Sequence, residues 1–382
     1  MKSYLQEELQ KIESLGVYRK LKTVDSPQGR EIILSGRRVL NFCSNDYLGL
    51  ANDERVKQAA VEAIEKFGFG SGASRLICGN MAPHERLEED LAQLKKTSCA
   101  LLFSSGYMAN TGIISALMDR EGVVISDRLN HASIVDGIVL SRAKLERYHH
   151  ADMQDLRRVL ERLPASKHKL IVTDSVFSMD GDKAPLEEIV RMAGRYEAMV
   201  MVDEAHAFGV LGKHGGGLVE ELGLGEKVDI QMGTLSKAAG CFGAYACGNE
   251  ILREFLINKS RSFIYTTAMP PALAQAARAA LQIIRQEEKL RRHLQECADY
   301  LRGHLQTMGF DTMNSTTPII PVLVKDSNQA KMMSENLLEQ GIFAQAIRPP
   351  TVPVGMARLR LTVTAVHTQA DIDQLLNAVR KL

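Results

Sequence analysis

Residues 198–206 have the sequence AMVMVDEAH, an apolar run that ends in two acids and, two positions later, a histidine. A continuous apolar run of this length is typical of a strand buried on both faces, as strands of a parallel sheet are. Runs of the same form recur along the chain, each with a small or polar end: ALLFSSG (100–106), GVVISD (122–127), KLIVTDSVF (169–177) and DIQMGTLSK (229–237). The sequence therefore predicts a set of buried strands.

Segments with helical periodicity separate these runs. HERLEEDLAQLKK (84–96) and APLEEIVRMAGRYE (184–197) alternate apolar and charged faces with the period of a helix. Strands and helices in alternation favour an α/β fold, in which helices cover both faces of a mostly parallel sheet. We assign this large domain to residues 46–275, after an N-terminal helix and strand segment at residues 1–45.

The rest of the chain predicts a smaller lobe. Residues 271–309 have a long helical pattern with one break. Strands are predicted at IIPVLV (319–324), IFAQAI (342–347) and ARLRLTVTA (357–365), with helices at 328–341 and 369–382. We therefore expect a small C-terminal α+β domain at residues 276–382.

Composition and charge exclude several classes of protein. Of the 382 residues, 45% are hydrophobic and 24% are charged, which is the balance of an ordinary globular protein. The net charge is only +1, so we expect no nucleic acid and no membrane as a partner.

The six cysteines lack CxxC pairs and zinc-site spacing, so we expect reduced thiols and no bound metal. Residues 1–16 have a charged amphipathic helix pattern rather than a targeting signal, and we expect a cytoplasmic protein.

Polar residues after the predicted strands are the first candidates for chemistry, because open α/β sheets bind ligands outside the carboxyl ends of their strands. Asp203 and His206 stand at one such end. The motif Asp-Glu-Ala-His also occurs in helicases, but that interpretation requires a GxxxxGK[ST] loop, and the Gly212-Lys213 pair lacks the upstream glycine. A helix N-cap for Asp203 and a packing role for His206 remain the competing interpretation.

Three other strand ends carry candidate residues. Ser105, Gly106 and Tyr107 stand where a helix should begin, and free N–H groups there suit a phosphate, although an ordinary capped turn has the same pattern. His131 follows a second strand, but a lone histidine is more often structural. Lys237 follows a third strand among small residues that leave room for a bulky group; a lysine reaching out to solvent is the alternative.

Together these residues match the needs of one cofactor. An aldehyde cofactor with a phosphate and a ring nitrogen needs an amine to bind it covalently, a carboxylate to keep the nitrogen protonated, and a phosphate cradle. Lys237 offers the amine, Asp203 the carboxylate, and residues 105–107 the cradle. The pattern therefore predicts pyridoxal 5'-phosphate (PLP).

The sequence also resembles a known family over nearly its whole length. The resemblance rests on NFCSNDYLGL (41–50), FGFGSGASRLICGN (67–80), LLFSSGYMAN (101–110), RLNHASIVDG (128–137), DSVFSMDGDKAPL (174–186), VDEAHAFGVLG (202–212), GTLSKAAG (233–240), FIYTTAMPP (263–271) and RLRLTVTAVHT (358–368). On these motifs the chain is similar to the α-oxoamine synthases, which are fold-type I PLP-dependent transferases. The resemblance implies a homodimer with active sites at the subunit interface.

One segment resembles a single branch of this family more than the others. AIRPPTVPVGMARLRLT (346–362) is most similar to the branch of the family that acts in biotin synthesis. That branch condenses L-alanine with pimeloyl-CoA or pimeloyl-acyl carrier protein, loses carbon dioxide and makes 8-amino-7-oxononanoate. A glycine-using acetyltransferase is the nearest alternative.

The resemblance also implies a role for each matching residue. Lys237 would bind the cofactor and move the substrate Cα proton, Asp203 would pair with the ring nitrogen, and His206 would hydrogen-bond the ring oxygen. His131 would stack on the ring. Further cofactor contacts are implied for Ser105, Gly106, Tyr107, Ser178 and Thr234, and for Thr266 and Thr267 toward the neighbouring subunit. Substrate contacts are implied for Arg19, Asn45, His131 and Thr351, and for Arg360 as a clamp on the amino-acid carboxylate.

Three positions depart from the family pattern. Asp174 stands where glutamate is frequent, Phe208 where a smaller residue is common, and Cys78 where serine is frequent. None of them belongs to the residues assigned to the cofactor, so we expect any effect to fall on the fit of the acyl chain.

Overall fold

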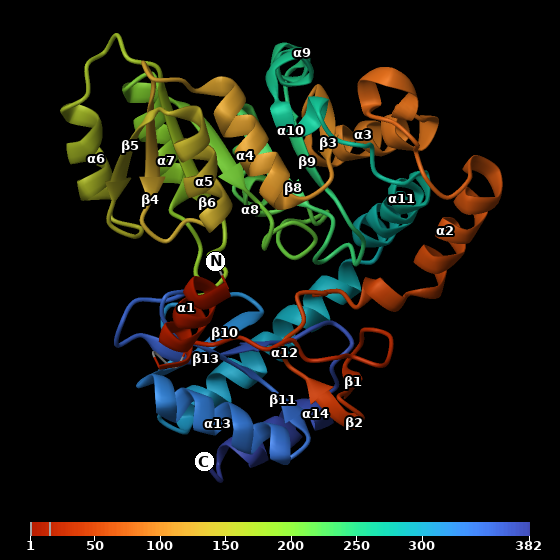
Figure 1. The fold of residues 1–382 in the computed structure, drawn as a ribbon, viewed down its shortest axis with the longest axis vertical. Helices are drawn as coiled ribbons and strands as arrows, with labels where there is room; N and C mark the ends of the chain where they lie inside the picture. The colour runs from red at the N-terminus through yellow and green to blue at the C-terminus, as the bar shows by residue number, and fades with distance from the viewer. Residues whose placement is uncertain (1, 15–16) are drawn as a thin grey trace.

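The structure is a computed structural model that describes residues 2–14 and 17–382 of the chain. Its larger body is built on a seven-stranded sheet with the order β3-β9-β8-β7-β6-β4-β5 (Figure 1). The strands are β3 (Cys99–Phe103), β4 (Val123–Asp127), β5 (Lys144–Tyr148), β6 (Lys169–Asp174), β7 (Met199–Asp203), β8 (Ile230–Thr234) and β9 (Ala244–Gly248). Neighbouring strands run parallel except at β9, which is antiparallel to β3 and β8. The predicted mostly parallel sheet is confirmed.

Two of these strands, β5 and β9, were not predicted, for different reasons. β5 is an edge strand with the sequence KLERY, whose charged and partly exposed residues form no continuous apolar run. β9 is wholly buried, but its sequence AYACG contains alanine and glycine, which are depleted in strands and give a weak signal.

Side chains of the sheet alternate between two cores on its two faces. In β7, Val200 and Val202 belong to one core and Met201 to the other, as the period of a strand requires. The Met201 face is covered by α4 (Gly106–Leu117), α5 (Ala132–Ser141), α9 (Glu250–Lys259) and α10 (Arg261–Ile264). The opposite core takes in α2 (Glu54–Phe67), α3 (Ala82–Lys95), α6 (Met153–Glu161), α7 (Leu186–Arg195), α8 (Leu218–Glu221) and α11 (Pro271–Gln286).

A smaller body lies beneath the large sheet in the view of Figure 1 and draws on both ends of the chain. β10 (Ile319–Lys325), β13 (Ala357–Thr362) and β12 (Gln345–Ile347) form an antiparallel sheet in the order β10-β13-β12. A second sheet joins β1 (Glu31–Leu34), β2 (Arg37–Asn41) and β11 (Ile342–Phe343). The helices are α12 (Glu288–Thr307), α13 (Ser327–Glu339) and α14 (Gln369–Val379). The predicted α+β lobe is confirmed, whereas the domain boundaries at 45/46 and 275/276 stay predictions.

Two details of this body refine the prediction. The helical pattern at 271–309 breaks at Glu287, between α11 and α12, as expected. The single strand predicted at 342–347 is wrong, because the chain changes sheets there: β11 pairs with β2, and β12 pairs with β13. An apolar run alone cannot show which partner each half will find.

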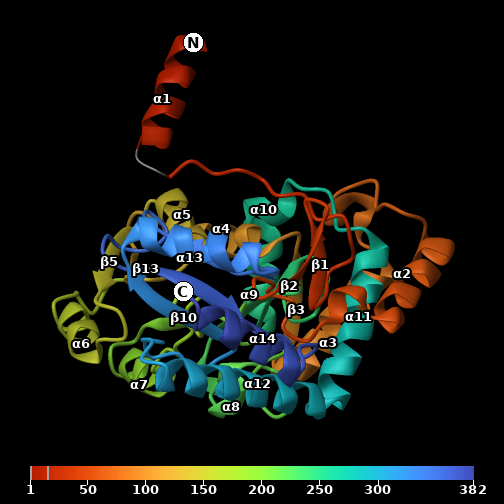
Figure 2. The same cartoon turned by 90° about the horizontal axis from the view of Figure 1, so that it is seen from below.

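The N-terminal helix α1 (Lys2–Ser14) stands away from the rest of the molecule (Figure 2). It confirms the amphipathic helix predicted at 1–16, apart from residues 1, 15 and 16, which lie outside the described part of the chain. Its apolar side chains Tyr4, Leu5, Leu9 and Ile12 are exposed. Within residues 2–14 and 17–382, no helix combines the length and the apolar character needed to cross a bilayer.

Candidate active site

The carboxyl ends of β6, β7 and β8 bring the predicted catalytic residues together. Asp203, the last residue of β7, is only 3% exposed, and Asp174 of β6 stands opposite it in register. One oxygen of the Asp203 carboxylate accepts from Asn110 Nδ2 at 2.8 Å, and the other accepts from the Ala205 N–H at 2.9 Å. These two donors compensate for the loss of hydration of the buried carboxylate.

A chain of polar side chains leads from Tyr47 to Lys237. Lys237 Nζ lies 2.8 Å from His206 Nε2, and His206 Nδ1 lies 2.6 Å from the Tyr47 hydroxyl. Burial, with a further contribution from the charge of Lys237, lowers the pKa of His206 well below its usual value. A neutral imidazole has one donor and one acceptor nitrogen. Of Tyr47 and Lys237, one therefore donates a hydrogen bond to His206 and the other accepts one.

Burial also governs the charge of Lys237. Removal from water lowers its pKa to about 8, although the carboxylates of Asp203 and Asp174 oppose that shift. About a tenth of the amine is therefore uncharged at pH 7, far more than for an ordinary lysine, and the uncharged form is the one that a nucleophile or a base requires.

His131 caps the start of α5, where its Nδ1 lies 2.7 Å from Ser133 Oγ. Its backbone N–H donates to Asp174 at 2.8 Å. Although His131 retains exposed surface, burial of part of its ring lowers its pKa, and Asp203 opposes the shift. Burial and the nearby Asp203 raise the pKa of Asp174 well above its usual value.

A pocket of about 340 Å³ opens where these strand ends face the smaller body. Residues predicted for the site line it, together with apolar side chains such as Phe343 and Ile347: Asn45, His131, Ser178, His206, Lys237 and Arg360. The two bodies therefore share one cavity, with the amine of Lys237 from one and the guanidinium of Arg360 from the other.

Arg360 in β13 is buried, at 6% exposure, yet the residues that hold it are all uncharged. Its Nε donates to the Ser178 carbonyl at 2.6 Å, and its Nη1 and Nη2 reach Thr362 Oγ1 at 2.9 Å and Asn45 Oδ1 at 3.0 Å. Among the described residues, Arg360 forms no ion pair with a carboxylate. A buried guanidinium held in this way favours an anionic ligand.

The residues predicted for a phosphate lie where α4 begins. Ser105 is the N-cap of α4, and its Oγ accepts from the Met108 N–H at 3.2 Å. A Cβ atom at Gly106 would lie 3.8 Å from Thr234 Cβ, so the start of α4 approaches the end of β8. The Tyr107 hydroxyl donates to Asp136, and the residue is half-exposed.

Asp203, Thr234 and residues 105–107 do not line this pocket, and four further predicted residues lie elsewhere. Arg19 and Thr351 contact each other, with Arg19 Nη2 3.4 Å from Thr351 Oγ1, and both are exposed. Thr266 and Thr267 line a separate, small cavity that also involves Ser104. Neither pair lines the Lys237 pocket as the described residues form it, and their implied roles stay predictions.

Sequence reasoning missed Asn110 and Tyr47. Asn110 Nδ2 joins Asp203 to Ser133 Oγ, which it approaches to 2.9 Å. It stands one helical turn after Gly106 in the same motif, so its position was a signal that was not used. Tyr47 stands in the motif at 41–50, two residues after Asn45, but its contact with His206 could not be predicted, since only folding brings residues 47 and 206 together.

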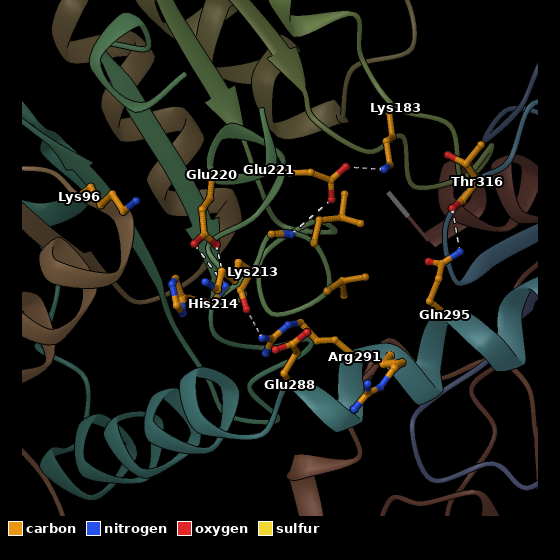
Figure 3. Close-up of a pocket in the computed structure, with 14 residues that line it drawn as sticks. Lys96, Lys183, Lys213, His214, Glu220, Glu221, Glu288, Arg291, Gln295 and Thr316 are labelled. Atoms are coloured by element: carbon orange, nitrogen blue, oxygen red, sulfur yellow. Dashed lines mark hydrogen bonds and ion pairs between the residues drawn. The ribbon is translucent and has the colours of Figure 1, made fainter. Parts of the chain in front are cut away.

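A larger pocket, of about 660 Å³, lies elsewhere, and none of the predicted site residues lines it. Figure 3 shows that several of its charged groups are bound to one another or to the backbone. Glu221 pairs with Lys183 at 2.8 Å, Glu220 accepts from the backbone N–H of His214 and Gly216, and Arg291 donates to the Lys213 carbonyl. Volume alone therefore does not mark the site.

In the described ranges, no group of three or more His, Cys, Asp or Glu side chains is arranged to hold a metal ion.

Comparisons with known proteins agree with this geometry. The family "Aminotransferase class I and II" matches residues 37–379. An 8-amino-7-oxononanoate synthase from Geobacter sulfurreducens is 50% identical over 98% of this chain and 96% of its own length. A solved structure of SPT (serine palmitoyltransferase) with a PLP internal aldimine has a TM-score of 0.94 at 35% identity, covering 99% of this chain and 96% of that chain. The 8-amino-7-oxononanoate synthase of Francisella tularensis has a TM-score of 0.79 at 31% identity, covering 90% and 97%.

Proposed function

The chain belongs to the aminotransferase class I and II family, and on that premise we propose that it is a PLP-dependent acyltransferase with the activity of 8-amino-7-oxononanoate synthase. In this reaction L-alanine condenses with a pimeloyl thioester, carried by CoA or by acyl carrier protein. The products are 8-amino-7-oxononanoate, carbon dioxide and the free thiol. Full-length similarity to several curated enzymes of that name supports the assignment.

One observation carries the proposal: a low-pKa amine and an unpaired guanidinium line the same pocket. Burial lowers the pKa of Lys237 to about 8, and Arg360 is buried without a carboxylate partner among the described residues. An α-amino acid matches this arrangement, since its carboxylate can bind Arg360 through two parallel hydrogen bonds while its amine lies toward Lys237.

The residues of the site fit PLP, which when bound supplies an aldehyde for the substrate amine and a ring that withdraws electrons from the substrate Cα. Lys237 would hold the aldehyde carbon, Asp203 the ring nitrogen and His206 the ring oxygen, with His131 on the ring face. Glycine at 106 keeps the start of α4 open beside Thr234, where a helix N-terminus suits a phosphate. Further contacts with the cofactor would come from Ser105, Tyr107, Ser178 and Thr234.

The chain's own groups then account for the proton transfers. Arg360 would fix the carboxylate of alanine so that the Cα proton faces Lys237 Nζ. The uncharged amine of Lys237 can accept that proton and later return it. His206, which burial keeps neutral, orients the amine without adding charge, and His131 can polarise the new ketone.

We also infer that the protein is a homodimer and, from the sequence alone, that it is cytoplasmic. Thr266 and Thr267 lie outside the Lys237 pocket of their own chain, in keeping with a role toward a second subunit. Their segment touches residues 67–80, since Ser71 Oγ donates to the Met269 carbonyl at 2.6 Å. Phe69, Ile77 and Tyr265 are exposed in these two segments, and a second copy would cover them.

A spectroscopic titration tests the function. The purified protein with PLP should show a visible absorption band that L-alanine perturbs at lower concentration than glycine does. Addition of pimeloyl-CoA should then yield 8-amino-7-oxononanoate, detected by mass spectrometry. Arg360→Lys should weaken the response to L-alanine by about tenfold, because lysine cannot make the bidentate contact.

The exposed Arg158→Lys variant serves as a matched control and should behave as the wild type. A stronger response to glycine would replace the alanine assignment with a glycine-using acetyltransferase. Absence of any band after PLP is added would refute the cofactor assignment altogether.

A further inference from the structure

Residues 175–184, here named the bridging loop, connect β6 to α7 and contact both bodies of the molecule. The loop closes on itself, because the Ala184 N–H donates to the Ser175 carbonyl at 3.0 Å and a β-bridge joins Val176 to Lys183. The Ser175 N–H also donates to the Asp203 carbonyl at 2.8 Å. The bridging loop therefore begins beside the backbone of Asp203 in the active site.

The tip of the bridging loop is bound to the smaller body. The Ser178 carbonyl accepts from Arg360 Nε at 2.6 Å, and Asp180 forms an ion pair of 2.6 Å with Arg358, which is 1% exposed. The Gly181 carbonyl accepts from Thr317 Oγ1 at 2.9 Å. The direction of the Arg360 guanidinium thus depends in part on where the loop places the Ser178 carbonyl.

The other side of the bridging loop is bound to the large sheet through His150, which follows β5. His150 Nε2 lies 2.8 Å from Asp182 in the loop, and Nδ1 lies 3.1 Å from Asp127 at the end of β4. The ring meets Phe177 of the loop edge-on, at 4.4 Å between centroids. Both nitrogens face carboxylates, so the ring must be doubly protonated to donate to both.

The protonation state of His150 agrees with that geometry. Burial by itself would lower its pKa, but the hydrogen bonds and charges of Asp127 and Asp182 outweigh it and raise the pKa to about 10. Near neutral pH the side chain is therefore a cation that joins two carboxylates, one on the sheet and one on the bridging loop.

We propose that His150 is a positioning residue for substrate binding: it fixes the bridging loop against the large sheet, and the loop in turn orients Arg360 toward the amino-acid carboxylate. The inference rests on the proposed function, which gives Arg360 its ligand. His150 itself does not line the Lys237 pocket. Its effect should accordingly fall on carboxylate recognition rather than on proton transfer at Lys237.

The test compares two ligands on the PLP-loaded variant His150→Gln: L-alanine, and ethylamine as an amine without a carboxylate. We expect the Kd and KM for L-alanine to rise by about tenfold, since a displaced contact weakens a directional hydrogen bond. The kcat should change by less than about threefold, and ethylamine should bind as it does to the wild type. A general loss of structure would instead weaken both ligands alike.

His149→Gln is the matched control. His149 is exposed, and its ring pairs with Asp155 of α6 at 2.6 Å rather than with the bridging loop. This variant should keep the wild-type Kd for L-alanine. Asp182→Asn, which changes only the loop end of the bridge, should reproduce the effect of His150→Gln, and the double variant should show no further loss.

Each outcome is decisive. Unchanged L-alanine affinity in His150→Gln, or equal weakening of both ligands, would overturn the positioning role. If His150→Gln fails to fold, Asp182→Asn provides the same comparison of ligands. If the wild type itself does not respond to L-alanine, the proposed function fails, and the inference falls with it for that separate reason.

Discussion

Lys237 and His150 are both basic groups near two carboxylates, yet their pKa values move in opposite directions. The pKa of Lys237 falls to about 8, whereas that of His150 rises to about 10. The Nζ of Lys237 hydrogen-bonds to neutral His206, and the carboxylates of Asp203 and Asp174 act on it only through space. His150 instead touches both of its carboxylates, at 3.1 and 2.8 Å.

The difference shows that depth of burial and direct contact, more than the number of nearby charges, set the protonation states of these two bases. Direct hydrogen bonds stabilise the charged form of His150 enough to outweigh desolvation. Lys237 lacks them and is partly uncharged, which suits a group that must react. The first region is built for chemistry and the second for holding the bridging loop against the large sheet.

The largest expected effect comes from removing the reactive member of this pair. Lys237→Ala should lower turnover of L-alanine and pimeloyl-CoA by at least about 10⁴-fold, because one residue supplies both attachment and proton transfer. Thermal unfolding should remain close to that of the wild type, since a desolvated lysine adds little to stability. Lys213→Ala, an exposed lysine elsewhere, is the control. Turnover near the wild-type level in Lys237→Ala would show that Lys237 is not the reactive group, and its contrast with His150 would fail.

A second experiment asks how much the carboxylates that do not touch Lys237 contribute to its pKa. Asp203→Asn removes the main charge that raises the pKa of Lys237, so that pKa should fall below about 8. The pH midpoint of Lys237 labelling by an amine reagent, followed by mass spectrometry on PLP-free protein, should move downward. Loss of the carboxylate should also lower kcat/KM by about hundredfold. An unmoved midpoint would show that Asp203 does not act on the amine.

The smallest effect concerns the pH dependence of stability at His150. Its folded pKa of about 10 lies above the ordinary 6.5, so the folded state binds the extra proton between these values. The stabilisation is therefore complete below about pH 6.5 and is lost as the pH rises through about 10. In urea unfolding, the difference between wild type and His150→Gln should shrink by about 2 kcal/mol from pH 7 to pH 10.5, after allowance for partial exposure. If the difference in unfolding free energy between wild type and His150→Gln did not change with pH, the charge of His150 would not stabilise the fold.

The strand-end residues Asp203, His206 and Lys237 could be predicted because their signal is local. Each lies at the end of a buried strand or within three residues of that end, and parallel strands bring such ends to one edge of a sheet. β5 and β9 escaped prediction because one is a charged edge strand and the other is rich in small residues. The run at 342–347 misled for a related reason, since its apolar pattern says nothing about which sheet each half joins.

By itself, the sequence determined the α/β architecture, the cofactor expected at Lys237 and the motifs that mark the family, because hydrophobic periodicity and strand-end chemistry are written in short segments. Tertiary structure alone decided the contact between Tyr47 and His206, the neutral shell around Arg360 and the bridge from Asp127 through His150 to Asp182. These contacts join residues distant along the chain. Their distances and their exclusion of water set the pKa values, and neither exists until the chain is folded.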